Sequence, residues 1–161
     1  MDELLGNWQV QLQVLGTTAY AMLLGGAIGY ERELKNRPAG FRTHMLVAGA
    51  AALLVGLVDL LAHRYSAEAY RELVRIDPIR LIEAMVAAVG FLGAGTIFRN
   101  RGEGGITGIT TAASLLMVAV IGIAAGVHSH VLAVGATALT LAVLFLLGWI
   151  ERRTGRISAS G

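Results

Sequence analysis

Residues 44–62 read HMLVAGAAALLVGLVDLLA, an apolar run in which Asp59 is the one acidic residue. A helix of roughly 20 such residues crosses the ~30 Å hydrocarbon core of a bilayer. Four further apolar runs of similar length occupy residues 12–30, 79–98, 107–126 and 129–150. The sequence therefore predicts an all-α membrane protein, a bundle of about five transmembrane helices.

The rest of the composition leaves little room for a second domain. The chain has 161 residues, of which 55% are hydrophobic, and no cysteine. We expect one transmembrane domain over residues 1–150 and a short basic tail over residues 151–161. The sequence begins MDELL, with acidic residues and no Lys or Arg before the first apolar run. Because a signal peptide starts with basic residues, we expect the first run to remain in the mature protein.

The distribution of Lys and Arg predicts the orientation. Cytosolic loops of membrane proteins carry an excess of these residues. With the N-terminus outside and the C-terminus in the cytosol, nine of the 13 basic residues lie on the cytosolic side and four outside. The nine are Arg32, Lys35, Arg37, Arg42, Arg99, Arg101, Arg152, Arg153 and Arg156; the four are Arg64, Arg71, Arg75 and Arg80.

The first cytosolic loop, residues 31–44, is rich in charge. Glu31 precedes Lys35 by four residues, the favourable order for a helical ion pair. Glycine and proline at residues 38–40 should then end the helix. Acidic side chains at a helix C-terminus are disfavoured by the helix dipole, so Glu31 and Glu33 need compensation from Arg42 or a bound cation. The alternative is a solvated, self-paired loop that touches anionic lipid.

A second polar pattern surrounds the start of the fourth apolar run. Thr107, Thr110, Thr111 and Ser114 are spaced i, i+3, i+4 and i+7, which places four hydroxyls on one helix face. The glycines at 93 and 95 should expose backbone carbonyls beside a cavity at the end of the third run. Alternatively, the hydroxyls only bond carbonyls of their own helix.

Charges also lie on the predicted outer side. Asp77 and Pro78 form a strong helix start, and Glu83 lies roughly 9 Å further along the axis. A carboxylate within a span is by default a functional candidate with a partner. The sequence therefore predicts an outer-side charge network of Asp59, Arg80 and Glu83, either as an ion site or as a pair that fixes helix register.

Small residues recur at helical spacing and predict close helix packing. They are Gly25 and Gly29, then Ala48, Ala52 and Gly56, then Gly122 and Gly126. Ala87, Gly90 and Ala94 follow Glu83 at the same spacing, so we expect Glu83 to point into the bundle.

Three of these stretches resemble the MgtC/SapB family: AGFRTH at 39–44, GFLGAGTI at 90–97 and TTAAS at 110–114. The resemblance implies a five-span, multi-pass bacterial inner-membrane protein linked to magnesium homeostasis at low magnesium and, in pathogens, to virulence through survival in macrophages. Family members are thought to modulate other membrane proteins, including the ATP synthase. Longer members carry a soluble C-terminal domain, which we do not expect in this chain because only eleven residues follow Ile150. Glu83 does not belong to the family pattern.

All three motifs fall at the predicted inner ends of the spans. We therefore expect them to converge in one cytosolic-side polar site. Its expected residues are Glu31, Glu33, Arg42, Thr43, His44, Gly93, Gly95, Thr107, Thr110 and Thr111.

Two functions fit this sequence. The first is a regulator of other membrane proteins, and the second is a cation transporter or channel, for Mg²⁺ or protons, that acts as a homo-oligomer. An enzyme is not expected, because no nucleophile–base pair, HExxH motif or phosphate loop occurs. The expected partners are lipids, other membrane proteins and further copies of the chain, without nucleic acid. No cofactor is expected apart from Mg²⁺ as the candidate ion.

Overall fold

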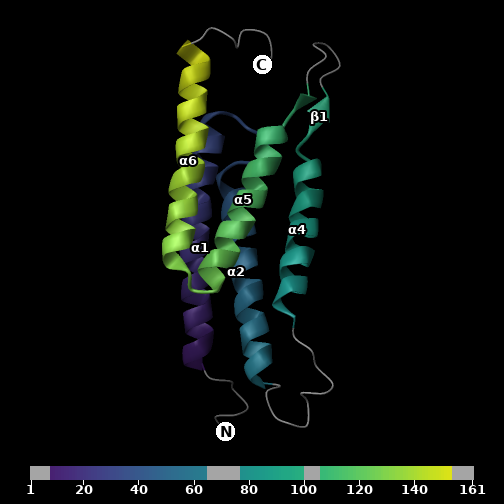
Figure 1. Cartoon of the computed structure of the whole chain (residues 1–161), viewed down its shortest axis with the longest axis vertical. Helices are drawn as coiled ribbons and strands as arrows, with labels where there is room; N and C mark the ends of the chain where they lie inside the picture. Colours follow the sequence, from purple (N-terminus) through teal and green to yellow (C-terminus); the bar gives the residue numbers. More distant parts are fainter. Residues whose placement is uncertain (1–7, 65–76, 100–105, 154–161) are drawn as a thin grey trace.

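The computed structural model describes residues 8–64, 77–99 and 106–153. These residues form the helices α1 (Trp8–Leu34), α2 (Phe41–Arg64), α4 (Pro78–Ala94), α5 (Ile109–Gly126) and α6 (His130–Arg153), and two short strands, β1 (Phe98–Arg99) and β2 (Ile106–Thr107). The helices run up and down one bundle, so that α1 begins at the end opposite to the one where α6 finishes (Figure 1). The prediction of a helical bundle is confirmed for the described residues. The predicted outer loop with Arg71 and Arg75, and the tail from residue 154 onward, lie outside them.

Three helices meet the length and apolarity needed to cross a bilayer. They are α1, the Phe41–Ala62 part of α2, and α5, while α6 contributes a shorter apolar segment, His130–Leu146. The helix α4 has 17 residues, about 25 Å at 1.5 Å per residue. We call the end of the bundle formed by the C-terminus of α1 and the N-terminus of α2 the inner end, after the predicted orientation, and the opposite end the outer end.

Left-handed residues and a capping side chain define the ends of the helices. Asn36 has a φ of 51°, and Arg37 N donates to Arg32 O at 3.0 Å, closing the last turn of α1 in the manner of a left-handed cap. The predicted break before α2 is thus confirmed. His128 plays the same part after α5 with a φ of 59°, and the Asp77 side chain caps α4 by accepting from Ile79 N at 3.0 Å.

The predicted third span is too long at its inner end. It was expected to reach Phe98, but α4 ends at Ala94 because Thr96 turns back and its hydroxyl donates to Gly93 O at 2.7 Å. The chain then enters the strand pair, in which Phe98 lies opposite Thr107. Gly108 has a φ of 93°, and a Cβ there would lie 1.8 Å from Thr96 O, so only glycine fits.

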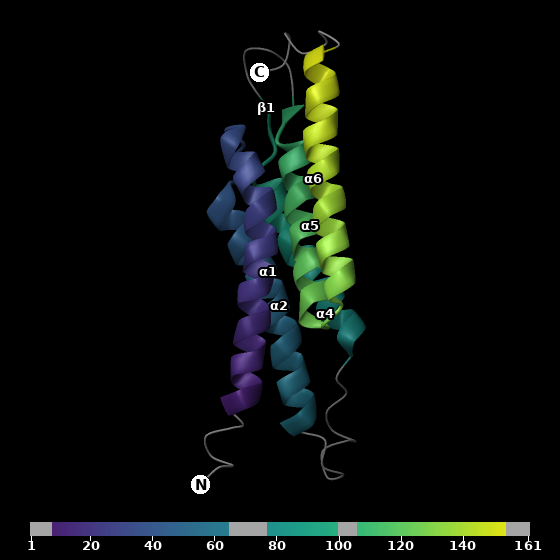
Figure 2. The same cartoon turned by 90° about the vertical axis from the view of Figure 1, so that its left-hand side faces the viewer.

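The centre of the bundle is formed by α1, α2 and α5, which pack closely through small residues (Figure 2). A Cβ on Gly25 would lie 2.6 Å from His44 O, and one on Gly122 would lie 2.3 Å from Ala48 O. Backbone therefore meets backbone at both crossings, which confirms the close packing predicted for these glycines. Apolar side chains fill the space between them: Ile28, Leu115, Val118 and Ile121.

The helix α4 lies at the edge of the bundle, packed on α5 and more lightly on α2 (Figure 1). Met85 and Val89 are its buried apolar residues. Glu83 is exposed, so the prediction that it points into the bundle is wrong. The small residues that share its face mark a surface suited to close approach, but α5 packs on the opposite side of the helix.

Candidate functional site

A buried charge cluster forms at the C-terminal turn of α1. The side chains of Glu31 and Arg32 are 2% and 4% exposed. Arg32 pairs through its guanidinium with Oε2 of Glu31, and Lys35 pairs with Oε1. The predicted pair of Glu31 and Lys35 is confirmed. The cluster holds two cations and one carboxylate, so it carries one excess positive charge in a place that water barely reaches.

Lys35 connects this cluster to α6. Its Nζ donates to the backbone oxygen of Leu144 at 3.0 Å and lies 5.8 Å from the centre of the Phe145 ring. A cation over an aromatic ring gains electrostatic attraction in addition to its hydrogen bonds. The ammonium group therefore joins the end of α1 to the inner part of α6, two helices that are 109 residues apart in sequence at this contact.

Glu33 has a different role from Glu31. It is exposed, and its Oε2 accepts from Phe41 N at 2.8 Å. This bond satisfies one of the free amides at the start of α2, as an N-capping side chain does. Both acids are thus compensated, as predicted, but the groups that pair with them are other than Arg42, which is exposed. Arg32 and Lys35 pair with Glu31, and the amide of Phe41 donates to Glu33.

His44 lies completely buried between α2 and α5. Its Nδ1 bonds Gly40 O at 2.8 Å and its Nε2 bonds Ser114 Oγ at 2.9 Å. The Ser114 hydroxyl in turn donates to Thr111 O at 2.8 Å. A Cβ on Gly29 would lie 2.8 Å from His44 Cβ, so that glycine allows α2 to pack closely on α1 at His44.

This chain of hydrogen bonds has two proton arrangements. Gly40 O only accepts, so Nδ1 of His44 carries a proton. The Ser114 hydroxyl has one proton to give. If it goes to Thr111 O, Nε2 of His44 must donate and the ring is cationic; if it goes to Nε2, the ring is neutral.

The structure divides the predicted cytosolic-side site into two parts. Glu31, His44 and Thr111 lie inside the bundle, whereas Arg42, Thr43 and Thr110 are exposed. Three further residues belong to other elements: Gly93 lies in the last turn of α4, Gly95 caps that helix, and Thr107 lies in β2. The predicted four-hydroxyl stripe is wrong at Thr107, which lies in β2 because Gly108 interrupts the helix.

Arg32 is the residue that sequence reasoning missed. It was counted as a loop charge that marks the cytosolic side. The available signal was its position seven residues after Gly25, which puts it on the same face as that small residue. A charge that continues a small-residue face of a helix is positioned for the bundle interior.

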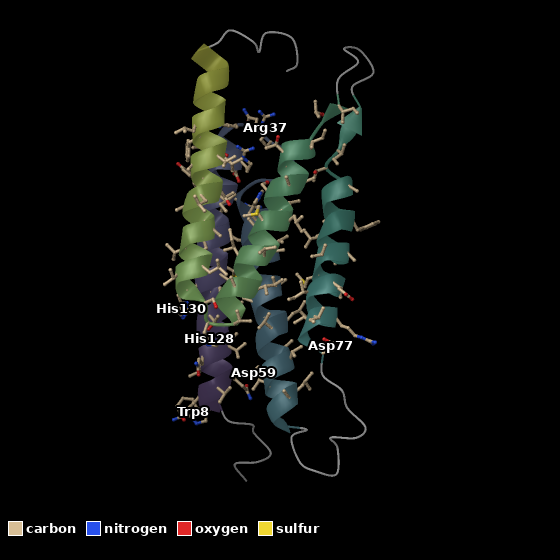
Figure 3. The ribbon with its side chains drawn as sticks, in the orientation of Figure 1. Trp8, Arg37, Asp59, Asp77, His128 and His130 are labelled. Atoms are coloured by element: carbon tan, nitrogen blue, oxygen red, sulfur yellow. The ribbon has the colours of Figure 1, made fainter. Side chains whose placement is uncertain are left out.

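The outer end holds a separate cavity of about 300 Å³, lined by Asp59, Thr17 and His128 among others. Gln13 Nε2 lies 3.4 Å from His128 Nε2 at its rim. Figure 3 shows Asp59 and His128 toward one end of the bundle and Arg37 toward the other. Within the residues that the structure describes, no three His, Asp or Glu side chains gather as a metal site would require.

The predicted network of Asp59, Arg80 and Glu83 is not assembled by the described contacts. Asp59 lines the cavity between α1, α2 and the end of α5. Arg80 pairs with Asp77 at 3.9 Å, and Glu83 lies on the open face of α4.

Three helices are long and apolar enough to cross a bilayer, and they pack in one tight bundle with a buried ionic cluster at its end. These features are those of a helical membrane protein. The model of the MgtC family matches residues 19–153. This chain therefore belongs to the MgtC family.

Several curated proteins are similar to this chain. It is 33% identical to "Protein SapB" of Bacillus subtilis over 92% of this chain and 62% of that protein. It is 38% identical to "Protein MgtC" of Brucella abortus over 87% of this chain and 53% of that protein. It is 36% identical to "Putative magnesium transporter YhiD" of Escherichia coli over 77% of this chain and 55% of that protein. The chain thus spans little more than half the length of these relatives. No solved structure gives a significant match.

Proposed function

We propose that this protein is a bacterial inner-membrane regulator that supports adaptation to low magnesium by modulating other membrane proteins, the ATP synthase among them. In this proposal the N-terminus lies outside and the C-terminus in the cytosol. The protein catalyses no reaction, requires no cofactor, and works with lipids and membrane proteins rather than nucleic acid. Support comes from its family and from a relative whose name refers to magnesium.

The observation that carries this proposal is that the charged groups of the inner-end cluster, which consists of Glu31, Arg32 and Lys35, pair with one another. Arg32 and Lys35 occupy both oxygens of Glu31. An entering Mg²⁺ would have to displace two cations and would meet their repulsion, which is strong where water is scarce. The cluster is therefore better suited to fixing the inner ends of α1 and α6 than to conducting a cation.

Fixed helix ends provide a stable surface for a partner. Arg37 and Arg42 are exposed beside the cluster, and Figure 3 shows Arg37 at this end of the bundle. Exposed arginines bind carboxylates in a bidentate manner. We infer that an acidic segment of a membrane protein docks on this basic surface, defined by Arg37 and Arg42.

ATP-driven acidification of inverted membrane vesicles tests the proposal. Wild-type protein should slow acidification, and the double variant Arg37→Gln/Arg42→Gln should restore the rate seen without the protein. The matched control is Thr43→Ala, which alters an exposed side chain next to Arg42 without removing a charge and should retain the wild-type effect. Equal rates with and without wild-type protein would contradict modulation of the ATP synthase.

The second candidate is a cation transporter or channel built as a homo-oligomer. It is favoured by the outer-end cavity, which Asp59 lines together with apolar residues, Thr17 and His128, and by the transporter name of one relative. In this alternative Asp59 attracts the cation at the outer end. A flux measurement with the pure protein distinguishes the two candidates.

A further inference from the structure

The helix α4 presents a face that nothing in the described chain covers. Its buried residues Met85 and Val89 face the bundle, and a Cβ on Gly93 would lie 3.2 Å from Ala112 Cβ of α5. On the opposite side, five exposed residues form a line that we call the α4 seam: Arg80, Glu83, Ala87, Gly90 and Ala94.

The spacing of the α4 seam is that of a helix-pairing surface. Its residues follow one another at intervals of three, four, three and four, the a/d repeat of two helices packed side by side. Three of the five are alanine or glycine, which let helix backbones approach closely in a membrane. A Cβ on Gly90 would meet no atom within 4 Å, so the space over this glycine is open.

The charges on the α4 seam indicate which partner packs on it. The side chain of Arg80 is 85% exposed, and its described partner, Asp77, is at the long distance of 3.9 Å. Glu83 lies two turns into the helix, and no described residue pairs with it. A carboxylate and a guanidinium facing lipid are costly, and such groups normally pair. The face thus presents one cation and one anion, each needing the opposite charge.

A second copy of the same chain supplies both charges, at positions along the helix axis where they can pair with those of the first copy. Copies inserted in one membrane share an orientation, so their α4 helices are parallel. Around a two-fold axis, each Arg80 meets the Glu83 of the other copy, because an isologous interface repeats every contact twice. The two residues differ by about 4.5 Å along the axis, which an arginine side chain spans.

We propose that two copies of this chain associate in parallel through the α4 seam, with Ala87, Gly90 and Ala94 at the close contact and two reciprocal Arg80–Glu83 ion pairs. This interface is independent of the proposed function, because the inner-end cluster and the basic surface lie on other helices.

Disulfide crosslinking tests the position of the interface. The chain contains no cysteine, so a single cysteine variant reports one site. A disulfide requires Cα atoms about 4.4–6.8 Å apart, and Gly90→Cys should give a covalent dimer upon mild oxidation in membranes. Gly16→Cys and Gly135→Cys are matched controls on α1 and α6, since a Cβ there also meets nothing within 4 Å. Crosslinking only at the controls, or none at all, would overturn the proposal.

A charge exchange tests the pairing itself. Copies with Arg80→Glu present two acids on the seam, and copies with Glu83→Arg present two bases. With Gly90→Cys in both, each variant alone should crosslink several-fold less than the parent. Co-expressed with different tags, the two variants should form the mixed dimer in excess over either self-dimer. Equal yields of mixed and self-dimers would show that Arg80 and Glu83 do not pair between copies, and would overturn the reciprocal arrangement.

Discussion

The Nε2 atom of His44 lies 2.9 Å from the Oγ atom of Ser114, and both side chains are buried. This bond connects α2 to α5, and Gly25 and Gly29 of α1 approach His44 closely at the same level, so the three central helices meet here. Removing the ring would take one hydrogen-bond partner each from Gly40 O and the serine hydroxyl and would open a cavity.

His44→Ala should therefore lower the free energy of unfolding by about 1–3 kcal/mol, the scale expected for two lost buried hydrogen bonds and a cavity. Thr43→Ala, one residue away and exposed, should change it by less than about 0.5 kcal/mol. Denaturant titration in detergent micelles, followed by circular dichroism, measures both. Similar losses for the two variants would contradict the structural role of the His44 bond.

Glu31→Gln should destabilise the protein by about 3–5 kcal/mol, because it leaves the buried Arg32 and the partly exposed Lys35 without their carboxylate. Adding Lys35→Met restores the original excess of one positive charge. The double variant Glu31→Gln/Lys35→Met should then be destabilised by less than the sum of the two single changes, since neighbouring charges couple. Strict additivity in the same titration would show that these charges do not interact.

Two glycine substitutions should change the stability of the protein in opposite directions. Gly122→Ala places a Cβ 2.3 Å from the backbone oxygen of Ala48, so α5 must move away from α2 at a cost of about 1–3 kcal/mol. Gly16→Ala meets nothing within 4 Å and should stabilise α1 by about 0.5–1 kcal/mol through helix propensity. Thermal unfolding in micelles measures the stability change of each variant. Stabilisation by Gly122→Ala would mean that α2 and α5 do not approach this closely.

Gly108→Ala should disrupt the connection between α4 and α5. The new side chain would have to adopt a φ of 93° and would clash with Thr96 O. We expect faster proteolysis between α4 and α5 and a lower yield of folded protein than for Gly135→Ala, which has open space. Identical protease sensitivity of the two variants would contradict the observed turn.

The fold was largely predictable, because apolar runs of membrane length and the signals at residues 38–40 and at Asp77 act locally. The strand pair before α5 was not predicted. Its two strands contain two residues each, too few to give a periodic signal. Glu83 was misplaced for another reason: small residues indicate close approach but do not say whether the neighbour is in the same chain or another one.

The candidate site was predictable in part. The pair of Glu31 and Lys35 follows from helical spacing alone. The burial of Arg32 and the bond from Lys35 to Leu144 O depend on how α2 and α6 pack on α1, and no local pattern in residues 31–44 contains that information. The same holds for His44 and Ser114, which are 70 residues apart.

Magnesium flux into proteoliposomes that contain only this protein tests the central claim most directly. An internal magnesium-sensitive dye reports entry after external Mg²⁺ is added. A regulator with an ion-paired inner end should give the same signal as empty liposomes, for the wild type and for Asp59→Asn alike. Saturable Mg²⁺ entry by the wild type that is lost in Asp59→Asn, a variant outside the inner-end cluster, would contradict the account and establish transport.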